Sequence, residues 1–175
     1  MEQMKQMKQM KKREQMKQPE CKNDANIVGN TEISKSLEGL LDIHTYEEIG
    51  YKPLFHCRDF RVARLNYHPE LLVENIGNFQ QHSLTDEAFI LLNGSCILFL
   101  AEDETIEKVH AVSLEPFKVY NVKQGTYHTH TLSEDAKVLI VEAEDTCDDN
   151  SPMVLVNDAI RARIREALGE VLGKS

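Results

Sequence analysis

The sequence is poor in paired cysteines, long apolar runs and positive charge. Its four cysteines are widely spaced and form no C-x-x-C pair, so neither a disulfide framework nor a zinc knuckle is indicated. No apolar run approaches the roughly 18 residues that a membrane-spanning helix needs, and the N-terminus lacks the apolar stretch of a signal peptide. We therefore expect reduced thiols, no membrane partner and a cytoplasmic location.

The shortage of positive charge argues against a nucleic-acid partner. Acidic residues outnumber basic ones by 29 to 20, which gives a formal net charge of −9. The basic residues cluster only within 1–18, so the remainder of the chain is still more acidic and would repel phosphate. Also absent are a nucleophile elbow, a phosphate-binding glycine loop and a Rossmann fingerprint. Covalent hydrolase chemistry and nucleotide-dependent chemistry therefore have no support.

The chain divides into four segments around one predicted domain, since 175 residues with 41% hydrophobic content suit a single core. Residues 1–20 form a low-complexity tail that repeats Met-Lys-Gln. We expect a solvated helical tail there, with a partner-binding arm as the alternative. Residues 21–45 suggest a linker with a short helix at 34–41. Residues 46–145 form the predicted barrel, and 146–175 form a C-terminal segment with a helix.

Residues 46–145 alternate short runs of β-forming residues with turn residues, which predicts an all-β antiparallel barrel or sandwich. The predicted strands are 60–67, 70–74, 79–82, 87–92, 95–101, 108–113, 117–122, 128–132 and 137–142. Asn93-Gly94 lies between two of these runs. This pair is typical of a two-residue type I′ hairpin, so we expect the flanking strands to be antiparallel partners.

The C-terminal segment predicts an amphipathic helix that Asn157 or Asp158 can cap. Its apolar face consists of Ile160, Ile164, Leu168, Val171 and Leu172. Such a stripe needs a partner surface, either the outside of the barrel or a second subunit. We therefore expect a homodimer.

Residues suited to chemistry gather in two short segments, 80–87 and 122–130. The first reads Gln-Gln-His-Ser-Leu-Thr-Asp-Glu, and the second reads Val-Lys-Gln-Gly-Thr-Tyr-His-Thr-His. Both resemble the paired motifs of the cupin superfamily. The family's first motif contains H-x-H, three or four residues, Glu, six residues and Gly; the second contains P-x-G, two residues and His. The matching residues are His82, Glu87, Gly94, Gly125 and His128.

The chain also departs from the family pattern. Gln80 takes the place of the first histidine of H-x-H. The other substituted positions are Glu74, Phe117, Lys123 and Leu132. The resemblance covers about 60–142 and implies a small single-domain, RmlC-like jelly-roll barrel with a divalent-metal site. The metal ligands that it implies are His82, Glu87, His128 and, in the altered position, Gln80.

Strand geometry independently supports a metal site. Residues two apart in a strand share a face, so Gln80 points the same way as His82, and His128 the same way as His130. Glu87 begins the next strand, and its carboxylate can reach the same point. Two imidazoles and one carboxylate suit Fe(II), Mn(II), Ni(II) or Zn(II), with open positions for water or substrate. A carbonyl oxygen from Gln80 would bind more weakly than an imidazole.

His130 is either a fourth ligand or a nearby acid or base, and Tyr127 is a second candidate for moving a proton. Side chains able to face the lumen and bind an anionic group are Arg61, Arg64, Tyr67, Tyr120 and Tyr127. Two functions stay open. The first is a metal-dependent enzyme acting on a small polar, carboxylate- or sugar-like molecule. The alternative is a metal-free binding or regulatory barrel whose histidines and glutamate survive as polar pocket walls.

Overall fold

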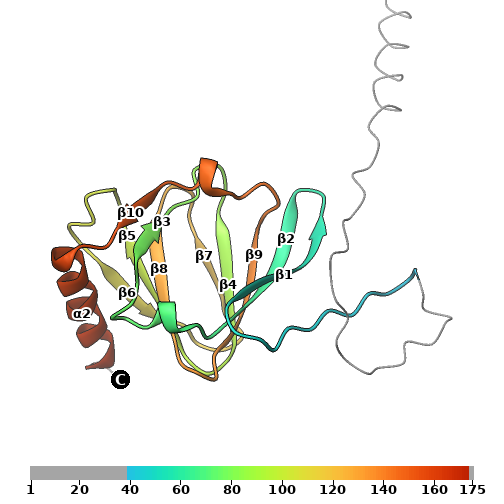
Figure 1. Cartoon of the computed structure of the whole chain (residues 1–175), viewed down its shortest axis with the longest axis horizontal. Helices are drawn as coiled ribbons and strands as arrows, with labels where there is room; N and C mark the ends of the chain where they lie inside the picture. The colour runs from blue at the N-terminus through green and yellow to red at the C-terminus, as the bar shows by residue number, and fades with distance from the viewer. Residues whose placement is uncertain (1–38, 174–175) are drawn as a thin grey trace, which may run out of the picture.

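The computed structural model describes residues 39–173, which form two facing antiparallel sheets of five strands each (Figure 1). In spatial order, the first sheet consists of β1 (Tyr51–Cys57), β2 (Phe60–Asn66), β9 (Lys137–Ala143), β4 (Glu87–Asn93) and β7 (Val119–Val122). The second consists of β10 (Met153–Leu155), β3 (Asn78–Gln80), β8 (Tyr127–Leu132), β5 (Cys96–Ala101) and β6 (His110–Ser113). The helical elements are η2 (Pro69–Leu71), η3 (Asp148–Asn150) and α2 (Asp158–Leu172). Within this range, every helix is too short or too polar to cross a lipid bilayer.

Side chains alternate between the two faces of each strand, and the inward set forms the core of the barrel. The inward, buried residues of β4 are Glu87, Phe89 and Leu91, and those of β9 are Val138, Ile140 and Glu142. Because β4 and β9 pair in antiparallel register, the carboxylates of Glu87 and Glu142 lie at the same end of the barrel. The core is therefore apolar along most of its length and polar at one end.

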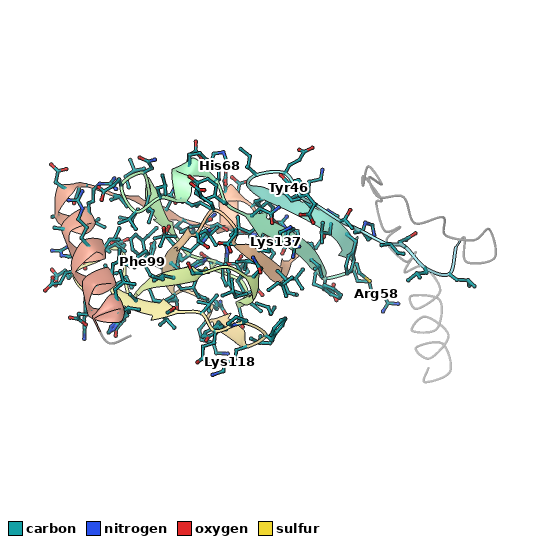
Figure 2. The ribbon with its side chains drawn as sticks, turned by 90° about the horizontal axis from the view of Figure 1, so that it is seen from below. Tyr46, Arg58, His68, Phe99, Lys118 and Lys137 are labelled. Atoms are coloured by element: carbon teal, nitrogen blue, oxygen red, sulfur yellow. The ribbon has the colours of Figure 1, made fainter. Side chains whose placement is uncertain are left out.

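A second core fills the space between the outer face of the second sheet and α2. Its fully buried side chains include Phe79 of β3, Ile164 of α2, and Phe99 of β5, which lies on the side of the barrel next to the helix (Figure 2). Asn157 caps α2, because its side-chain oxygen accepts a hydrogen bond of 2.9 Å from the first turn. Of the two partner surfaces considered for this helix, the structure shows the outside of the barrel. Leu172 at its end is 60% exposed, and the homodimer stays a prediction.

Most predicted strands are confirmed to within about two residues at each end. The strand predicted at 70–74 is wrong, because the chain forms η2 there. Pro69 stands in the first turn, where its fixed φ suits a helical conformation, and the ring of His68 accepts a hydrogen bond from the amide of Glu70. Two strands were not predicted, β1 and β10. Both lie at sheet edges, and β1 contains Pro53, which a central strand would not tolerate.

The expectation for Asn93-Gly94 is also wrong. The flanking strands β4 and β5 lie in different sheets, and each pairs with other strands of the described chain. Gly94 has a positive φ of 70° but Asn93 does not, so the link is not a type I′ turn. It crosses from one sheet to the other. Glycine is needed because a Cβ at Gly94 would lie 2.7 Å from the backbone of Ala136.

Two predictions concern residues outside the described range. The helical tail at 1–20 lies outside it, as does most of the short helix at 34–41, of which residues 39 and 40 form a turn.

The C-terminal segment 146–175 contributes more than a helix, since β10 pairs with β3 and extends the second sheet. The barrel therefore continues past the predicted boundary at residue 145.

Candidate metal centre

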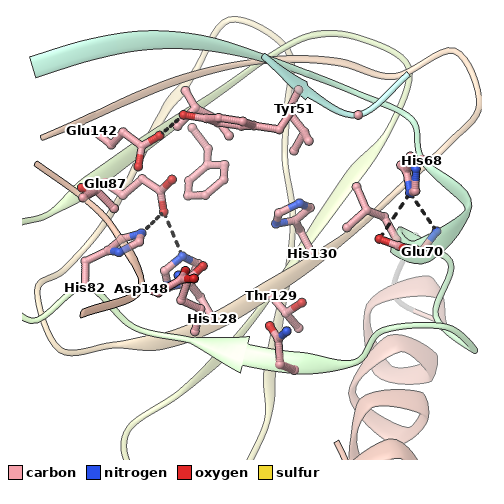
Figure 3. Close-up of a pocket in the computed structure, with 18 of the residues that line it drawn as sticks. Tyr51, His68, Glu70, His82, Glu87, His128, Thr129, His130, Glu142 and Asp148 are labelled. Carbon is pink, nitrogen blue, oxygen red and sulfur yellow. Dashed lines mark hydrogen bonds and ion pairs between the residues drawn. The ribbon is translucent and has the colours of Figure 1, made fainter. Parts of the chain in front are cut away.

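A cavity of about 620 Å³ lies between the two sheets, at the end of the barrel where Glu87 and Glu142 lie (Figure 3). Predicted site residues that line it are Gln80, His82, Glu87, His128 and His130. They come from β3 and the loop after it, from β4 and from β8, so both sheets contribute to its wall. The structure thus brings together the two segments that were singled out in the sequence.

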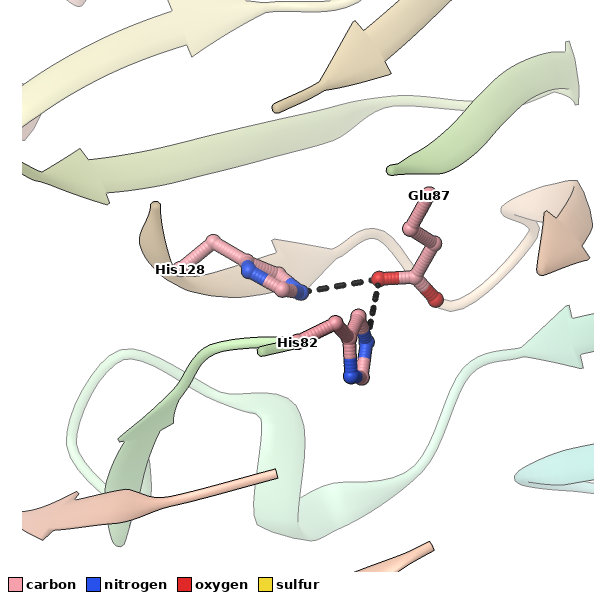
Figure 4. A group of neighbouring side chains, drawn as sticks. All are labelled: His82, Glu87 and His128. Carbon is pink, nitrogen blue, oxygen red and sulfur yellow. Dashed lines mark hydrogen bonds and ion pairs between the residues drawn. The ribbon is translucent and has the colours of Figure 1, made fainter. Parts of the chain in front are cut away.

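Three of these side chains form a compact buried cluster (Figure 4). Nε2 of His82 lies 3.0 Å from Oε2 of Glu87, and Nε2 of His128 lies 2.8 Å from the same oxygen. Each of the three residues is 6% exposed. Their ligand atoms all lie within 4.8 Å of one another, close enough to share one ion.

In each imidazole, the hydrogen bond made by Nδ1 determines whether Nε2 is available to a metal ion. Nδ1 of His128 lies 3.0 Å from the backbone oxygen of Thr126, which can only accept, so Nδ1 carries a hydrogen. Nδ1 of His82 lies 3.0 Å from the hydroxyl of Ser151, and this hydroxyl donates to Asn150. Ser151 therefore accepts its hydrogen bond from His82. Each Nε2 can therefore present a lone pair to an ion, and in the absence of an ion an Nε2 that carries a hydrogen donates it to Glu87.

This donor set fits a divalent cation. Two imidazole nitrogens and a carboxylate oxygen converge on one point beside the cavity, a combination that Fe(II), Mn(II), Ni(II) and Zn(II) all accept. Each imidazole is also held by a second hydrogen bond, as is usual for metal-bound histidines. The residues of the cluster therefore suit both the charge and the ligand preferences of such an ion.

The charges and hydrogen bonds within the cluster favour the binding of a cation. Burial would raise the pKa of Glu87, but hydrogen bonds from His128 and His82 outweigh burial and lower that pKa to about 2. Burial would lower the pKa of His128, yet the hydrogen bond and charge of Glu87 raise it above the ordinary 6.5. A carboxylate that stays anionic beside an imidazole that favours a proton is a place where a metal ion can replace that proton.

Asp86 links the loop that follows β3 to the turn that precedes β8, and these two segments lead to the candidate ligands. Its carboxylate accepts hydrogen bonds of 2.7 to 2.8 Å from Asn121, Lys123 and Gln124. The backbone adds a bond of 2.9 Å from the amide of Gly125 to the oxygen of His82. These contacts join the loop that begins at His82 to the turn that leads into β8. Lys123, which replaces the proline of the family motif, thus helps to align the ligands.

Gln80 lies beside the cluster, on the same wall of the cavity. It is directly opposite His128 across β3 and β8, and opposed residues of an antiparallel pair share a face. Gln80 and His82 both line the cavity as predicted, although β3 ends at Gln80 and His82 lies in the loop that follows. Coordination by the Gln80 carbonyl oxygen stays a prediction.

His130 lines the cavity two residues beyond His128, with its ring centre 5.9 Å from that of Phe89. Both ring nitrogens are shielded from solvent and lack a hydrogen-bond partner among the described residues. Burial, followed by the charge of His128, lowers the pKa of His130 to about 4, so the ring is neutral near pH 7. It does not belong to the three-residue cluster, which favours a role as acid or base over that of a fourth ligand.

Tyr127 lies on the opposite face of β8, because adjacent residues of a strand point in opposite directions. Its side chain is buried beneath α2 with Phe79 and Ile160. The structure therefore does not bring Tyr127 to the cavity, which leaves its predicted proton transfer without access to a bound molecule. Of the five side chains considered for anion binding, Arg61 alone lines the cavity.

The C-terminal segment holds a part of the site that the sequence did not reveal. Ser151 is fully buried, and it orients His82. Backbone hydrogen bonds from Ser83 to Asn150 and from Gln81 to Pro152 hold this segment against the ligand loop. No local motif marks these residues, since the pairing of β10 with β3 brings them there.

Solved structures with a similar fold include three small bacterial or archaeal proteins. A cupin-2 domain protein from Shewanella frigidimarina is 20% identical, with a TM-score of 0.39 over 62% of this chain and 90% of that one. An RmlC-like cupin from Methanocaldococcus jannaschii is 9% identical, with a TM-score of 0.43, and the match covers 59% of this chain and 91% of that one. A Bacillus halodurans protein is 12% identical, with a TM-score of 0.46, and the match covers 69% of this chain and 85% of that one. No protein-family model matches the chain, and no curated protein matches it significantly.

Similarities this low concern the fold alone. The chain's own strand order forms a double-stranded β-helix, and its two motif-like segments meet at one buried cluster. At this level the fold that the sequence resemblance implied is confirmed, since the chain forms a jelly-roll barrel of two antiparallel sheets with a C-terminal helix packed on it.

Proposed function

We propose that this protein is a metal-dependent enzyme whose ion is held by His82, Glu87 and His128, and whose substrate is a small polar, carboxylate- or sugar-like molecule. One observation carries the proposal. Both Nε2 atoms are directed at Oε2 of Glu87, while both Nδ1 atoms are already bonded to other acceptors. A bound ion would supply Lewis acidity that polarises a carbonyl or stabilises an enolate.

The chain's own residues supply the other parts of such a reaction. His130 is neutral and unpaired, so its ring offers one lone pair and one N–H to a bound molecule. Because its ring lines the same cavity as the three ligands, His130 is placed to act as the acid or base of the reaction. Gln80 on the same wall adds a carbonyl oxygen to the ion or a hydrogen bond to the molecule.

A second candidate function is metal-free binding or regulation. The observation in its favour is that the three residues satisfy one another, since Glu87 accepts hydrogen bonds of ordinary length from both imidazoles. In this state His128 carries a proton where the enzyme would carry an ion. The barrel would then bind a small molecule without turning it over.

Metal content decides between the two functions. The full-length protein, purified without chelators and loaded with Fe(II), Mn(II), Ni(II) or Zn(II), should hold about one ion per chain. His82→Ala, Glu87→Ala and His128→Ala should each lower metal affinity at least about a hundredfold, because each removes one of three strong donors. Gln80→Ala should lower metal affinity by a smaller factor than these three variants. Gln80→His should bind more tightly, because imidazole is a stronger ligand than a neutral carbonyl.

His56→Ala is the matched control for these variants. His56 pairs with Glu144 away from the cavity, so its removal should leave metal content unchanged. Negligible metal in the wild type and in every variant, even after loading, would overturn the metal centre and favour the metal-free barrel.

A further inference from the structure

A second polar cluster lines the same cavity and is separate from the metal centre (Figure 3). It joins three strands of the first sheet, through Tyr51 at the start of β1, Arg61 of β2 and Glu142 of β9. The register places Arg61 directly opposite Glu142, so their side chains share a face. Glu142 is 5% exposed. The cluster is therefore built into the wall of the cavity.

One oxygen of Glu142 already has partners. The Tyr51 hydroxyl donates to Oε1 of Glu142, and Nε of Arg61 lies 3.1 Å from the same oxygen as an ion pair. Nη2 of Arg61 donates to the backbone oxygen of Thr146 at 3.1 Å. Within residues 39–173, Nε of Arg61 is buried and lacks a hydrogen-bond partner despite this ion pair, and Oε2 of Glu142 accepts no hydrogen bond. The cluster thus keeps one acceptor and one donor unused beside the cavity.

These unused atoms define what the cluster can bind. Oε2 of Glu142 requires an O–H or N–H on the ligand, and Nε of Arg61 requires a lone pair. A carboxylate lacks the hydrogen and would be repelled by Glu142. An ammonium lacks the lone pair and would be repelled by Arg61. A hydroxyl group meets both requirements, and it is neutral like the cluster, in which the two charges cancel.

Tyr51 supports the same choice. Burial and the neighbouring Glu142 raise the pKa of Tyr51 far above its ordinary value, so its hydroxyl stays protonated and donates to Glu142. The phenol also pairs with Arg61, so it is a neutral group that holds the other two side chains of the cluster in place.

The two polar clusters that line the cavity differ in charge. A divalent ion beside the Glu87 carboxylate leaves one net positive charge, which favours an anionic group of the ligand there. The neighbouring cluster of Tyr51, Arg61 and Glu142 is neutral. Apolar side chains on the wall of the same cavity can contact a short carbon chain, and they are Leu65, Phe89 and Ile140.

We propose that Tyr51, Arg61 and Glu142 form a hydroxyl-binding subsite, and that the substrate is a hydroxylated carboxylic acid of the sugar-acid class with its carboxylate at the metal centre. The substrate class rests on the proposed metal centre, which anchors the carboxylate. The subsite itself consists of residues that form no hydrogen bond to His82, Glu87 or His128 within the described chain.

Matched pairs of acids test the subsite. The full-length Mn(II)-loaded protein is titrated calorimetrically with threonate, ribonate and gluconate, and with 2-hydroxybutyrate, 2-hydroxypentanoate and 2-hydroxyhexanoate. The two acids of a pair share chain length, carboxylate and first hydroxyl, and differ only in the further hydroxyls. At least one sugar acid should bind about tenfold to a hundredfold more tightly than its partner, because a buried charged group left unpaired is costly.

In protein saturated with Mn(II), Glu142→Gln should reduce this preference by about tenfold, while affinity for the simple hydroxy acids stays unchanged. Tyr51→Phe changes a more exposed residue and should reduce the preference by a smaller factor. Glu144→Gln is the matched control, since this neighbouring carboxylate pairs with His56 and does not line the cavity.

Two results would overturn the subsite: equal binding of the two acids in every pair, or a preference that survives both Glu142→Gln and Tyr51→Phe. Failure of Mn(II) to bind the wild type would overturn the proposed function instead. The same pairs titrated into the metal-free protein would then decide the subsite by the same criterion, because its donors and acceptors do not depend on the ion.

Discussion

The two faces of β8 show how one strand serves two different cores. His128 and His130 face inward and reach the cavity, whereas Tyr127 faces outward and packs beneath α2. The outward core is closed by the helix, and its largest members, Phe79 and Phe99, are fully buried. The inward core is open at one end, and the cluster of His82, Glu87 and His128 lies there.

The outward core therefore contributes mainly to the stability of the fold, whereas the inward core holds the side chains suited to chemistry. A closed apolar layer contributes free energy through burial and tolerates no water. A polar cluster at the open end of the barrel needs an entry path and needs hydrogen bonds to hold its side chains. If the two cores are independent, a change in one should leave the property of the other intact.

The largest expected effect is on the outward core. Phe99→Ala should lower the free energy of unfolding by about 3 to 5 kcal/mol, because it leaves a cavity beneath α2. Its metal affinity, measured where the protein is still folded, should match the wild type. Urea denaturation and metal analysis check both points. Phe117→Ala is the control, since Phe117 is 79% exposed and should change stability by less than about 0.5 kcal/mol.

A smaller effect is expected for the residue that orients a ligand. Ser151→Ala removes the acceptor for Nδ1 of His82 and should weaken metal binding about tenfold to a hundredfold. Competition with a chelator measures this loss. Ser83→Ala changes a serine in the ligand loop whose hydroxyl has no hydrogen bond within the described chain, so it should bind metal normally. Equal affinity in the two variants would contradict the role of Ser151.

The smallest expected effect, taken over a single pH unit, is the change of metal affinity with pH. The pKa of His128 is raised, so below that pKa an ion must displace a proton, and affinity should fall about tenfold per pH unit. Glu87 stays ionised in this range because its pKa is about 2. Metal titrations between about pH 8 and about pH 5 should show this decline, with roughly one proton released per ion. A flat profile would contradict competition at His128.

The same pKa shifts imply opposite trends in the stability of the metal-free fold. The stabilisation from His128 is complete below its unfolded pKa and is lost as the pH rises through its higher folded pKa. The stabilisation from Glu87 is present above its unfolded value of about 4.5 and is lost as the pH falls toward 2. Denaturation of Glu87→Gln at several pH values should lack the second trend.

Much of the metal centre could be predicted because its signals are local. Strand alternation placed His128 and His130 on one face, and motif spacing pointed to His82 and Glu87. The same alternation excludes Tyr127 from that face, so its predicted role conflicted with the rule that placed His128. The strand at 70–74 failed for a local reason as well, since Pro69 begins a turn there.

By itself, the sequence determined which side chains share a face and which short segments carry the candidate ligands, because these properties depend on the two-residue period of a strand. The tertiary structure decided which strands meet. In the folded chain, Asn93-Gly94 connects the two sheets, Ser151 hydrogen-bonds to His82, and Arg61 forms an ion pair with Glu142. These contacts join residues far apart in the chain, and their pairing depends on how the whole barrel buries its apolar faces, which no local pattern specifies.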